Sequence, residues 1–509
     1  SSNIGGIIGI NNGNMYSGYN ESIVSGKDKV GGIIGENSTG GTVTNIVNAT
    51  SVTGENVSAD NVSQYVGGLV GSNSGSVTNG RNNGTITGTN YVGGMVGSNA
   101  QGATLTNLVN DSSAAIEGEN YVGGIAGTNA GTITAQNQSN LINRGSITGQ
   151  NYVGGVAGEN IGTIEYVKND VNLYVKDDTK TAQYFGGVAG INGRVDDETT
   201  TDVNEAVTGT ITSATNEGDV VAENAQYVGG IVGWNTSQGK LVGMGNSNEG
   251  TVIGGSYVGG VIGKNDAAIG SKGSAQVGIT NEGTVIATKG GAGGLIGENN
   301  AAITNTVMIN RGEVHGNNTN DGSGTGGLIG TNNENGDITY SSLINEVTGT
   351  VTGTNNVGGL IGVNKADITG GRYTVTGEDA GMYINKIYNN GVINVGTYGD
   401  TDNDGDYEFT AGTGQNIGGL IGDNQGSLTA GYNTGAINAS GSRNVGGIAG
   451  SNSGTIDQVF NTVMTPDNAV KPDGSKQEAS ITGGTNVGGL VGDNTGTITN
   501  AYNTSNVVA

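Results

Sequence analysis

The sequence predicts an all-β fold, a parallel β-helix (β-solenoid) with about three short strands per coil. Three observations support it. A Gly-Gly-[Ile/Leu/Val/Met]-[Ile/Val/Ala]-Gly-x-Asn motif recurs fifteen times, short β-branched runs separate its copies, and the chain holds 102 Gly but 2 Pro in 509 residues. The absence of Gly-X-Y triplets excludes collagen. Regular placement of the apolar residues argues against disorder, because each unit of a repeat fold buries them against the next unit.

The motif sets the length of one coil. Every copy ends in Asn, from Asn11 in the first copy to Asn494 in the last. The copies begin at Gly5, Gly31, Gly67, Gly93, Gly123, Gly154, Gly186, Gly229, Gly259, Gly293, Gly326, Gly358, Gly418, Gly446 and Gly488. Most copies are about 30 residues apart, which suits one motif per coil. Fifteen coils stacked about 4.8 Å apart would form a rod about 70 Å long.

Two further elements follow each copy and complete the coil. The first is a short strand, such as the Gly-Ser-Val-Thr run at 75–78. The second is Asn-x-Gly-x-[Val/Ile], as in the Asn-Arg-Gly-Ser-Ile run at 143–147. Alternation points the single Val or Ile inward and its Ser or Thr neighbours outward. No sustained 3.6-residue period is present, and Gly and Asn disfavour helix interiors.

The asparagine that ends each motif is expected to stack on its copies. Asn tolerates the left-handed backbone region, and its amide can hydrogen-bond to the Asn one coil away. Gly at the turns permits positive φ or close approach to the coil below. We therefore predict an asparagine ladder formed by Asn73, Asn99, Asn129, Asn160, Asn192 and Asn235.

A tyrosine column is predicted beside the ladder. Tyr precedes the Val or Phe of the motif in seven successive copies, at Tyr65, Tyr91, Tyr121, Tyr152, Tyr184, Tyr227 and Tyr257. Rings one coil apart would form a stack that stabilises the solenoid or, alternatively, a platform on which carbohydrate stacks. From Asn356 onward the same position is Asn.

The domain prediction is a single continuous solenoid over residues 1–509. Longer gaps between motifs predict inserted loops near 45–64, 193–226, 371–415 and 457–485. The chain starts and finishes inside repeats, without the amphipathic cap that an isolated solenoid needs. We therefore expect a piece of a longer protein, or a unit capped by neighbours.

The repeats resemble a known bacterial family. The segment 65–78, Tyr-Val-Gly-Gly-Leu-Val-Gly-Ser-Asn-Ser-Gly-Ser-Val-Thr, is similar to the GLUG repeat, which is named for its Gly-Leu-x-Gly core. The resemblance covers nearly the whole chain. It implies a large secreted or surface-anchored bacterial protein, such as an adhesin or an immunoglobulin A protease that carries the repeats beside a separate catalytic domain. The repeats themselves are a scaffold that several functions share.

Composition excludes several functions. The formal charge is −25, which argues against nucleic acid as a partner. No Cys is present, and no apolar stretch approaches the roughly 18 residues that a membrane span needs. The single His, His315, cannot form the two-histidine HExxH zinc site, and strand alternation places its side chain in solvent. We therefore predict no enzyme activity; the alternative is a carbohydrate-active β-helix enzyme with its site in the inserted loops.

One acidic cluster is a candidate calcium site. The run 400–408, Asp-Thr-Asp-Asn-Asp-Gly-Asp-Tyr-Glu, matches the first half of an EF-hand loop. The side chains of Asp400, Asp402 and Asp404 and the backbone carbonyl of Asp406 would supply oxygen ligands. Glu408 would bind directly or through a water molecule. Ala411 stands where the usual bidentate acid would be. We predict Ca²⁺ there, or otherwise a solvated acidic loop.

These patterns together predict a structural and adhesive role. The chain is expected to be the rod or stalk of a bacterial extracellular adhesin or fibre, located outside the cell or on its surface. Expected partners are other copies of the chain, end to end or side by side through open strand edges, and host or bacterial surface glycans or proteins. The sequence names no particular ligand.

Overall fold

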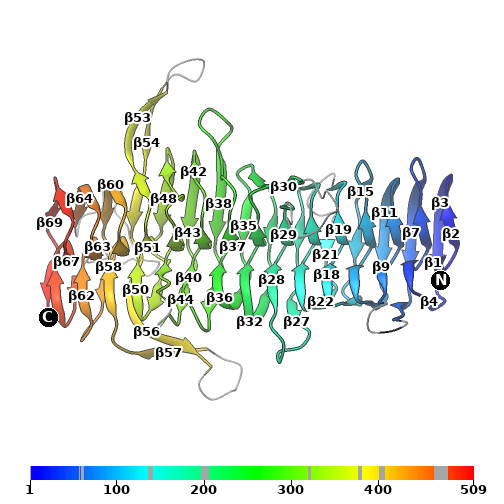
Figure 1. The fold of residues 1–509 in the computed structure, drawn as a ribbon, viewed down its shortest axis with the longest axis horizontal. Coiled ribbons are helices and arrows are strands. Elements are labelled where there is room, and N and C mark those ends of the chain that lie inside the picture. The colour runs from blue at the N-terminus through cyan, green and yellow to red at the C-terminus, as the bar shows by residue number, and fades with distance from the viewer. Residues whose placement is uncertain are drawn as a thin grey trace. The chain divides into compact units, whose positions relative to one another are not determined.

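The fold is all-β. The computed structural model describes residues 2–56, 58, 62–135, 142–195, 206–318, 322–375, 381–400, 407–462 and 480–509. Every regular element in these ranges is a β-strand. The chain divides into two compact units, Ser1–Gly250 and Thr251–Ala509. Each unit contains long parallel sheets, as expected for a β-solenoid (Figure 1). The predicted all-β class is therefore confirmed.

One repeat of the first unit shows how the sequence maps onto the sheets. It contains four strands: β9 (Gln64–Gly67), β10 (Val70–Asn73), β11 (Ser76–Asn82) and β12 (Ile86–Thr87). Strands β9 and β12 belong to one sheet, here sheet A, β10 to sheet B and β11 to sheet C. Each strand pairs in parallel with its counterpart in the next repeat.

Sheet B holds the strand of every Gly-Gly-x-x-Gly-x-Asn motif. Its strands in the first unit are β2 (Ile8–Asn11), β6 (Ile34–Asn37), β10, β14 (Val96–Asn99), β19 (Ala126–Asn129), β24 (Ala157–Asn160), β29 (Ala189–Asn192) and β33 (Val232–Asn235). In the second unit they are β37 (Ile262–Asn265), β41 (Ile296–Asn299), β46 (Ile329–Asn332), β51 (Ile361–Asn364), β59 (Ile421–Asn424), β63 (Ala449–Asn452) and β67 (Val491–Asn494). The register aligns equivalent residues, so that Val70 lies beside Val96 and Asn73 beside Asn99.

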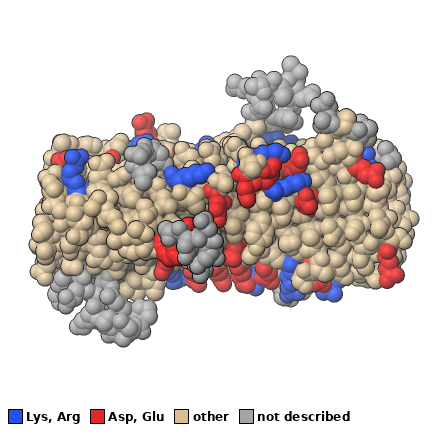
Figure 2. Space-filling view, turned by 90° about the horizontal axis from the view of Figure 1, so that it is seen from below, with Lys and Arg blue, Asp and Glu red and all other residues tan. Residues whose placement is uncertain are grey.

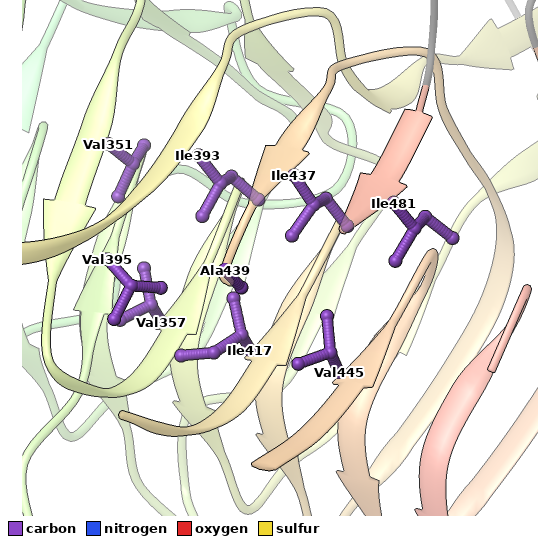
Figure 3. Close-up of a cluster of buried hydrophobic side chains, with 9 residues drawn as sticks. All are labelled: Val351, Val357, Ile393, Val395, Ile417, Ile437, Ala439, Val445 and Ile481. Carbon is purple, nitrogen blue, oxygen red and sulfur yellow. The ribbon is translucent and has the colours of Figure 1, made fainter. Parts of the chain in front are cut away.

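The core consists of columns of inward-pointing aliphatic side chains. In the repeat around β10, the fully buried residues are Val66, Leu69, Val77 and Ile86. Figure 3 shows the same arrangement in the second unit, where Val351, Ile393, Ile437 and Ile481 follow one another along one column. Each fully buried Val or Ile side chain stabilises the fold by about 1.5–3 kcal/mol relative to exposure. The large number of such columns compensates for the low overall hydrophobicity.

The motif glycines permit close approach between backbones. A Cβ on Gly68 would meet the carbonyl oxygen of Gly94 and, at 2.6 Å, the side-chain Cγ of Asn82. A Cβ on Gly71 would meet the backbone nitrogen of Val30 at 2.6 Å. Neither glycine has a positive φ. Close approach is therefore the reason for glycine at these two positions.

Three of the predicted insertions are shorter than the spacing of the motifs indicates. Near 45–64, the strands β7 (Thr42–Asn48) and β8 (Val52–Gly54) keep the regular register, so the extra residues follow Gly54. Near 193–226, an antiparallel bridge joins Arg194 to Val207, and β30 (Gly209–Thr212) resumes the parallel ladder. Near 457–485, β64 (Thr455–Asn461) and β65 (Ser480–Thr482) lie in the sheets.

The 371–415 insertion contains two antiparallel hairpins. The first joins β53 (Gly371–Val375) to β54 (Gly381–Asn385). The chain then returns to the parallel sheets as β55 (Ile387–Asn389) and the start of β56 (Ile393–Gly399). The second hairpin joins the end of β56 to β57 (Glu408–Ala411). The two hairpins extend away from the parallel strands in different directions (Figure 1).

Candidate functional site

The asparagines that end the sheet B strands form a continuous ladder in each unit. Each side-chain Nδ2 donates to the Oδ1 of the Asn in the next repeat. The distance is 2.9 Å from Asn73 to Asn99 and 2.8 Å from Asn99 to Asn129, and the series continues through Asn160 and Asn192 to Asn235 at 2.8–2.9 Å. These side chains are fully buried. Asn73 also bonds the backbone of Gly75 in both directions, which fixes the corner between sheets B and C.

The structure contains a second buried asparagine ladder, which was not predicted from the sequence. It is formed by the Asn that ends the sheet C strands, which in several repeats belongs to the Asn-x-Gly-x-[Val/Ile] element. Asn82 Nδ2 donates to Asn110 Oδ1 at 3.0 Å, and Asn110 Nδ2 donates to Asn143 Oδ1 at 2.8 Å. The same contacts recur in the second unit, for example from Asn389 to Asn433 at 2.9 Å. The recurrence of an Asn at this point of each repeat was the available signal.

The tyrosine column lies at a left-handed backbone position. The φ angles of Tyr65, Tyr91, Tyr121, Tyr152, Tyr184 and Tyr227 lie between 55° and 62°. Successive rings are stacked, with centroids 4.8 Å apart for Tyr91 and Tyr121 and 4.6 Å apart for Tyr121 and Tyr152. The planes of these two pairs differ by 8° and 5°. Tyr257, in the second unit, has the same backbone conformation, with φ of 54°.

Stacking decides which part of each tyrosine is available to a ligand. Because the ring faces lie against one another, the column presents ring edges and hydroxyls, and no flat aromatic face. The residue between the Gly and Asn of the motif lies opposite the column. In the second repeat Lys29 stands at the position of the tyrosines and Glu36 at the position between Gly and Asn, and their Nζ and Oε2 atoms are 2.7 Å apart. In later repeats the same two columns line a groove of about 790 Å³.

A part-buried ion pair lines this groove. Arg194 donates from Nε to Glu159 Oε1 at 2.9 Å and from an Nη to Glu159 Oε2 at 2.6 Å. The hydroxyl of Thr128 donates to the same Oε2 at 2.8 Å. Glu159 is 3% exposed. Paired, two-point hydrogen bonding of this kind fixes the guanidinium with little freedom.

Burial also makes three phenols of the column weaker acids. It raises the pKa of Tyr91, Tyr121 and Tyr152 above the usual tyrosine value, and the nearby charge of Glu159 acts in the same direction. The hydrogen bond that Arg194 donates to Glu159 raises the pKa of Arg194. At neutral pH the groove therefore contains protonated phenols beside one charged pair.

The sequence pattern did not identify Glu159, Arg194 and Trp234 as groove residues. Glu159 and Trp234 occupy the variable position of the Gly-x-Asn motif. The indole of Trp234 stacks on Tyr184 with ring centroids 5.2 Å apart. Aligning the repeats on that variable position would have placed both residues in one column. Arg194 lies at the start of an insertion, where the repeat gives no register.

In the last four repeats of the second unit, asparagines occupy the left-handed position. Asn356, Asn416, Asn444 and Asn486 have φ between 50° and 59°. Asn416 Nδ2 donates to Asn356 Oδ1 at 2.9 Å, and Asn444 Nδ2 donates to Asn416 Oδ1 at 3.0 Å. A hydrogen-bonded ladder thus replaces the stack of rings.

The candidate calcium loop connects the strands of the second hairpin. Asp402, Asp404 and Asp406 lie outside the described residues. Asp400 follows β56 directly, and Glu408 is the first residue of β57, paired with Gly399. Among described residues, no group of three or more His, Asp or Glu could hold a metal ion. Calcium binding remains a prediction.

The prediction that His315 faces solvent is wrong. His315 does point away from the core side of its strand, β44 (Val314–Gly316), but it is 3% exposed. The ring of Tyr398, from the second hairpin, covers it at a centroid distance of 3.6 Å. Asn317 holds the hairpin in place, because its side-chain amide bonds both the backbone nitrogen and the backbone oxygen of Tyr398. Contact with a distant insertion cannot be inferred from strand alternation.

Charge and comparison with known proteins add two findings. Figure 2 shows acidic side chains outnumbering basic ones on the face in view, most of which is uncharged. No helix among the described residues is long and apolar enough to cross a membrane. The chain matches no protein-family model, no curated protein and no solved structure.

Proposed function

We propose that the chain is the structural rod or stalk of a bacterial extracellular adhesin or fibre. In this proposal each unit is a parallel β-helix whose coils have three faces, corresponding to sheets A, B and C. The observation that carries the proposal is the buried asparagine ladder, which runs through every sheet B strand of each unit. Such a ladder propagates a stack of coils with no limit on their number.

Two further features support a load-bearing role. Neighbouring repeats are held together along three parallel sheets as well as by two ladders, so that separating two coils breaks many hydrogen bonds at once. The resemblance to GLUG repeats favours a secreted or surface-anchored bacterial protein. The acidic composition, with 44 Asp and Glu against 19 Lys and Arg, favours solubility outside the cell.

Localisation and adhesion test this proposal. Antibodies raised against the purified chain are expected to label intact, unpermeabilised cells of the source bacterium. Deleting the region that encodes residues 1–509 from its gene is expected to remove the label and reduce attachment of the cells to a host surface. Labelling only after permeabilisation, or attachment unchanged by the deletion, would contradict the proposal.

A further inference from the structure

The groove of the first unit has the features of a ligand site. It is lined by the edges of Tyr65, Tyr91, Tyr121 and Tyr152 and by the Glu159–Arg194 pair. Its volume of about 790 Å³ lies within the range of 300–1,000 Å³ that is typical of small-molecule sites. Most of the molecule's buried positions repeat from coil to coil, whereas this combination of rings and charges occurs where the Tyr column faces Glu159.

The four tyrosine hydroxyls are available for hydrogen bonding. Tyr65, Tyr91, Tyr121 and Tyr152 stack with one another, but none of their hydroxyls bonds to any described residue. Their rings are partly buried. A row of half-buried hydroxyl groups, each able to donate and accept, repeats at ring spacings of 4.6–5.0 Å. That repeat is similar to the advance of a sugar chain by one pyranose unit.

The charged pair adds hydrogen-bond donors of fixed orientation to this row of hydroxyls. Glu159 is satisfied by Arg194 and Thr128, whereas the Arg194 side chain is 33% exposed and has donors beyond the two that bond Glu159. A guanidinium fixed by two bonds to a carboxylate can donate to two adjacent hydroxyls without rearranging. The charges of Glu159 and Arg194 compensate each other, and they are the only charged side chains among the described residues that line the groove.

We propose that this groove binds an uncharged oligosaccharide. Hydroxyl groups of the sugar would bond the phenol edges and Arg194, while its apolar ring hydrogens would lie on Ile161 and Ile191. An anionic polysaccharide fits less well, because the whole chain carries a net charge of −25. A peptide fits less well, because the sheet strands beside the groove pair on both sides within parallel sheets and offer no open edge.

This inference goes beyond the structural role and can fail separately from it. Surface labelling tests where the chain is located, whereas binding by the purified chain tests the groove. A chain that is on the cell surface but binds no sugar would leave the structural proposal intact and overturn the inference. A chain that binds sugar but is not on the surface would do the reverse.

Glycan binding by the purified full chain is the direct test. The chain is applied to an array of neutral, acidic and basic oligosaccharides, and the best neutral binder is then measured by calorimetry. The double variant Tyr121→Phe/Tyr152→Phe keeps both rings in the stack and removes two hydroxyls; we expect it to weaken binding at least tenfold. Arg194→Gln is expected to weaken binding by a similar factor.

Matched controls separate binding from folding. Tyr432→Phe removes a hydroxyl from a different stack, between Tyr388 and Phe460 in the second unit, and is expected to leave affinity unchanged. Circular dichroism and urea unfolding of all variants show whether the fold is retained. Absence of any neutral glycan binder, a preference for acidic glycans or peptides, or equal affinity of folded groove variants and the parent chain would overturn the proposal.

Discussion

The two units place different side chains at the same left-handed backbone position. In both units the residue directly before the buried Val or Ile of the motif has a left-handed conformation, with φ of 56° at Tyr121 and 59° at Asn416. Six repeats of the first unit place stacked tyrosines there, from Tyr65 to Tyr227, and the last four repeats of the second unit place hydrogen-bonded asparagines, from Asn356 to Asn486. Asn tolerates this region, whereas for other residues it costs roughly 1–2 kcal/mol.

This difference shows which part of the repeat is fixed and which part can vary. The left-handed turn follows from the geometry of the corner, because it recurs with either residue. Tyrosine is the less favourable choice for the backbone, and its stacking and burial offset that strain. Asparagine alone would suffice to build the turn, so the presence of tyrosine in the first unit supports a role for the groove that it lines.

The largest expected effect should be equal in the two units. Asn129→Ala and Asn364→Ala each remove a buried rung from the sheet B ladder of their own unit. Each leaves buried amide groups of its neighbours without partners, at about 1–3 kcal/mol per group. We expect a loss of about 3–5 kcal/mol in unfolding free energy for both variants, measured by urea denaturation. Unequal losses would mean that the ladder has different roles in the two units.

Exchanging a residue of the column should destabilise the first unit by a smaller amount. Tyr121→Asn removes contacts with the rings on both sides, each worth about 0.5–1.5 kcal/mol beyond burial, and relieves backbone strain of about 1 kcal/mol. The expected net loss is about 2 kcal/mol by urea denaturation. A gain in stability would show that strain outweighs stacking. Tyr121→Phe is the control, because it keeps the ring.

The reverse exchange in the second unit should have a somewhat weaker effect. Asn416→Tyr removes two partly exposed hydrogen bonds, to Asn356 and Asn444, and puts a bulky residue at a φ of 59°. The ring would have no aromatic neighbour in its column. We expect the free energy of unfolding, measured by urea denaturation, to fall by about 1–2 kcal/mol. Each exposed hydrogen bond contributes about 0.5 kcal/mol and backbone strain contributes the rest. Asn416→Gly is the control, because glycine relieves strain while removing the same bonds.

Repetition explains how much of the fold could be predicted from the sequence. The all-β class follows from the motif, since the Asn of Asn73 recurs in every copy, the position of Val70 always holds Val, Ile or Ala, and both pair with their counterparts in neighbouring repeats. The spacing of motifs reveals the length of an insertion but not its boundaries. The sequence therefore did not show that Ile393, inside the 371–415 segment, occupies a regular core position between Val351 and Ile437.

The candidate groove was less predictable because it depends on residues outside the repeat. The Tyr column was visible in the sequence, but the orientation of its rings was not, and stacking is what turns their edges outward. Arg194 reaches Glu159 across 35 residues from an insertion with no register. His315 shows the same limit, since its cover, Tyr398, comes from a hairpin that strand alternation does not anticipate.

The smallest expected effect is a difference at alkaline pH that involves the first unit alone. Burial raises the pKa of the Tyr121 phenol, so ionisation favours the unfolded chain once the pH exceeds the unfolded value of about 10. Its stabilising contribution is therefore complete below pH 10 and is lost as the pH rises towards the folded pKa. Between pH 9 and pH 11 the free energy of unfolding of the parent chain should fall by about 1 kcal/mol more than that of Tyr121→Phe. The measurement is urea denaturation of both chains at the two pH values; parallel losses would show that the phenol of Tyr121 is as exposed in the folded chain as in the unfolded one.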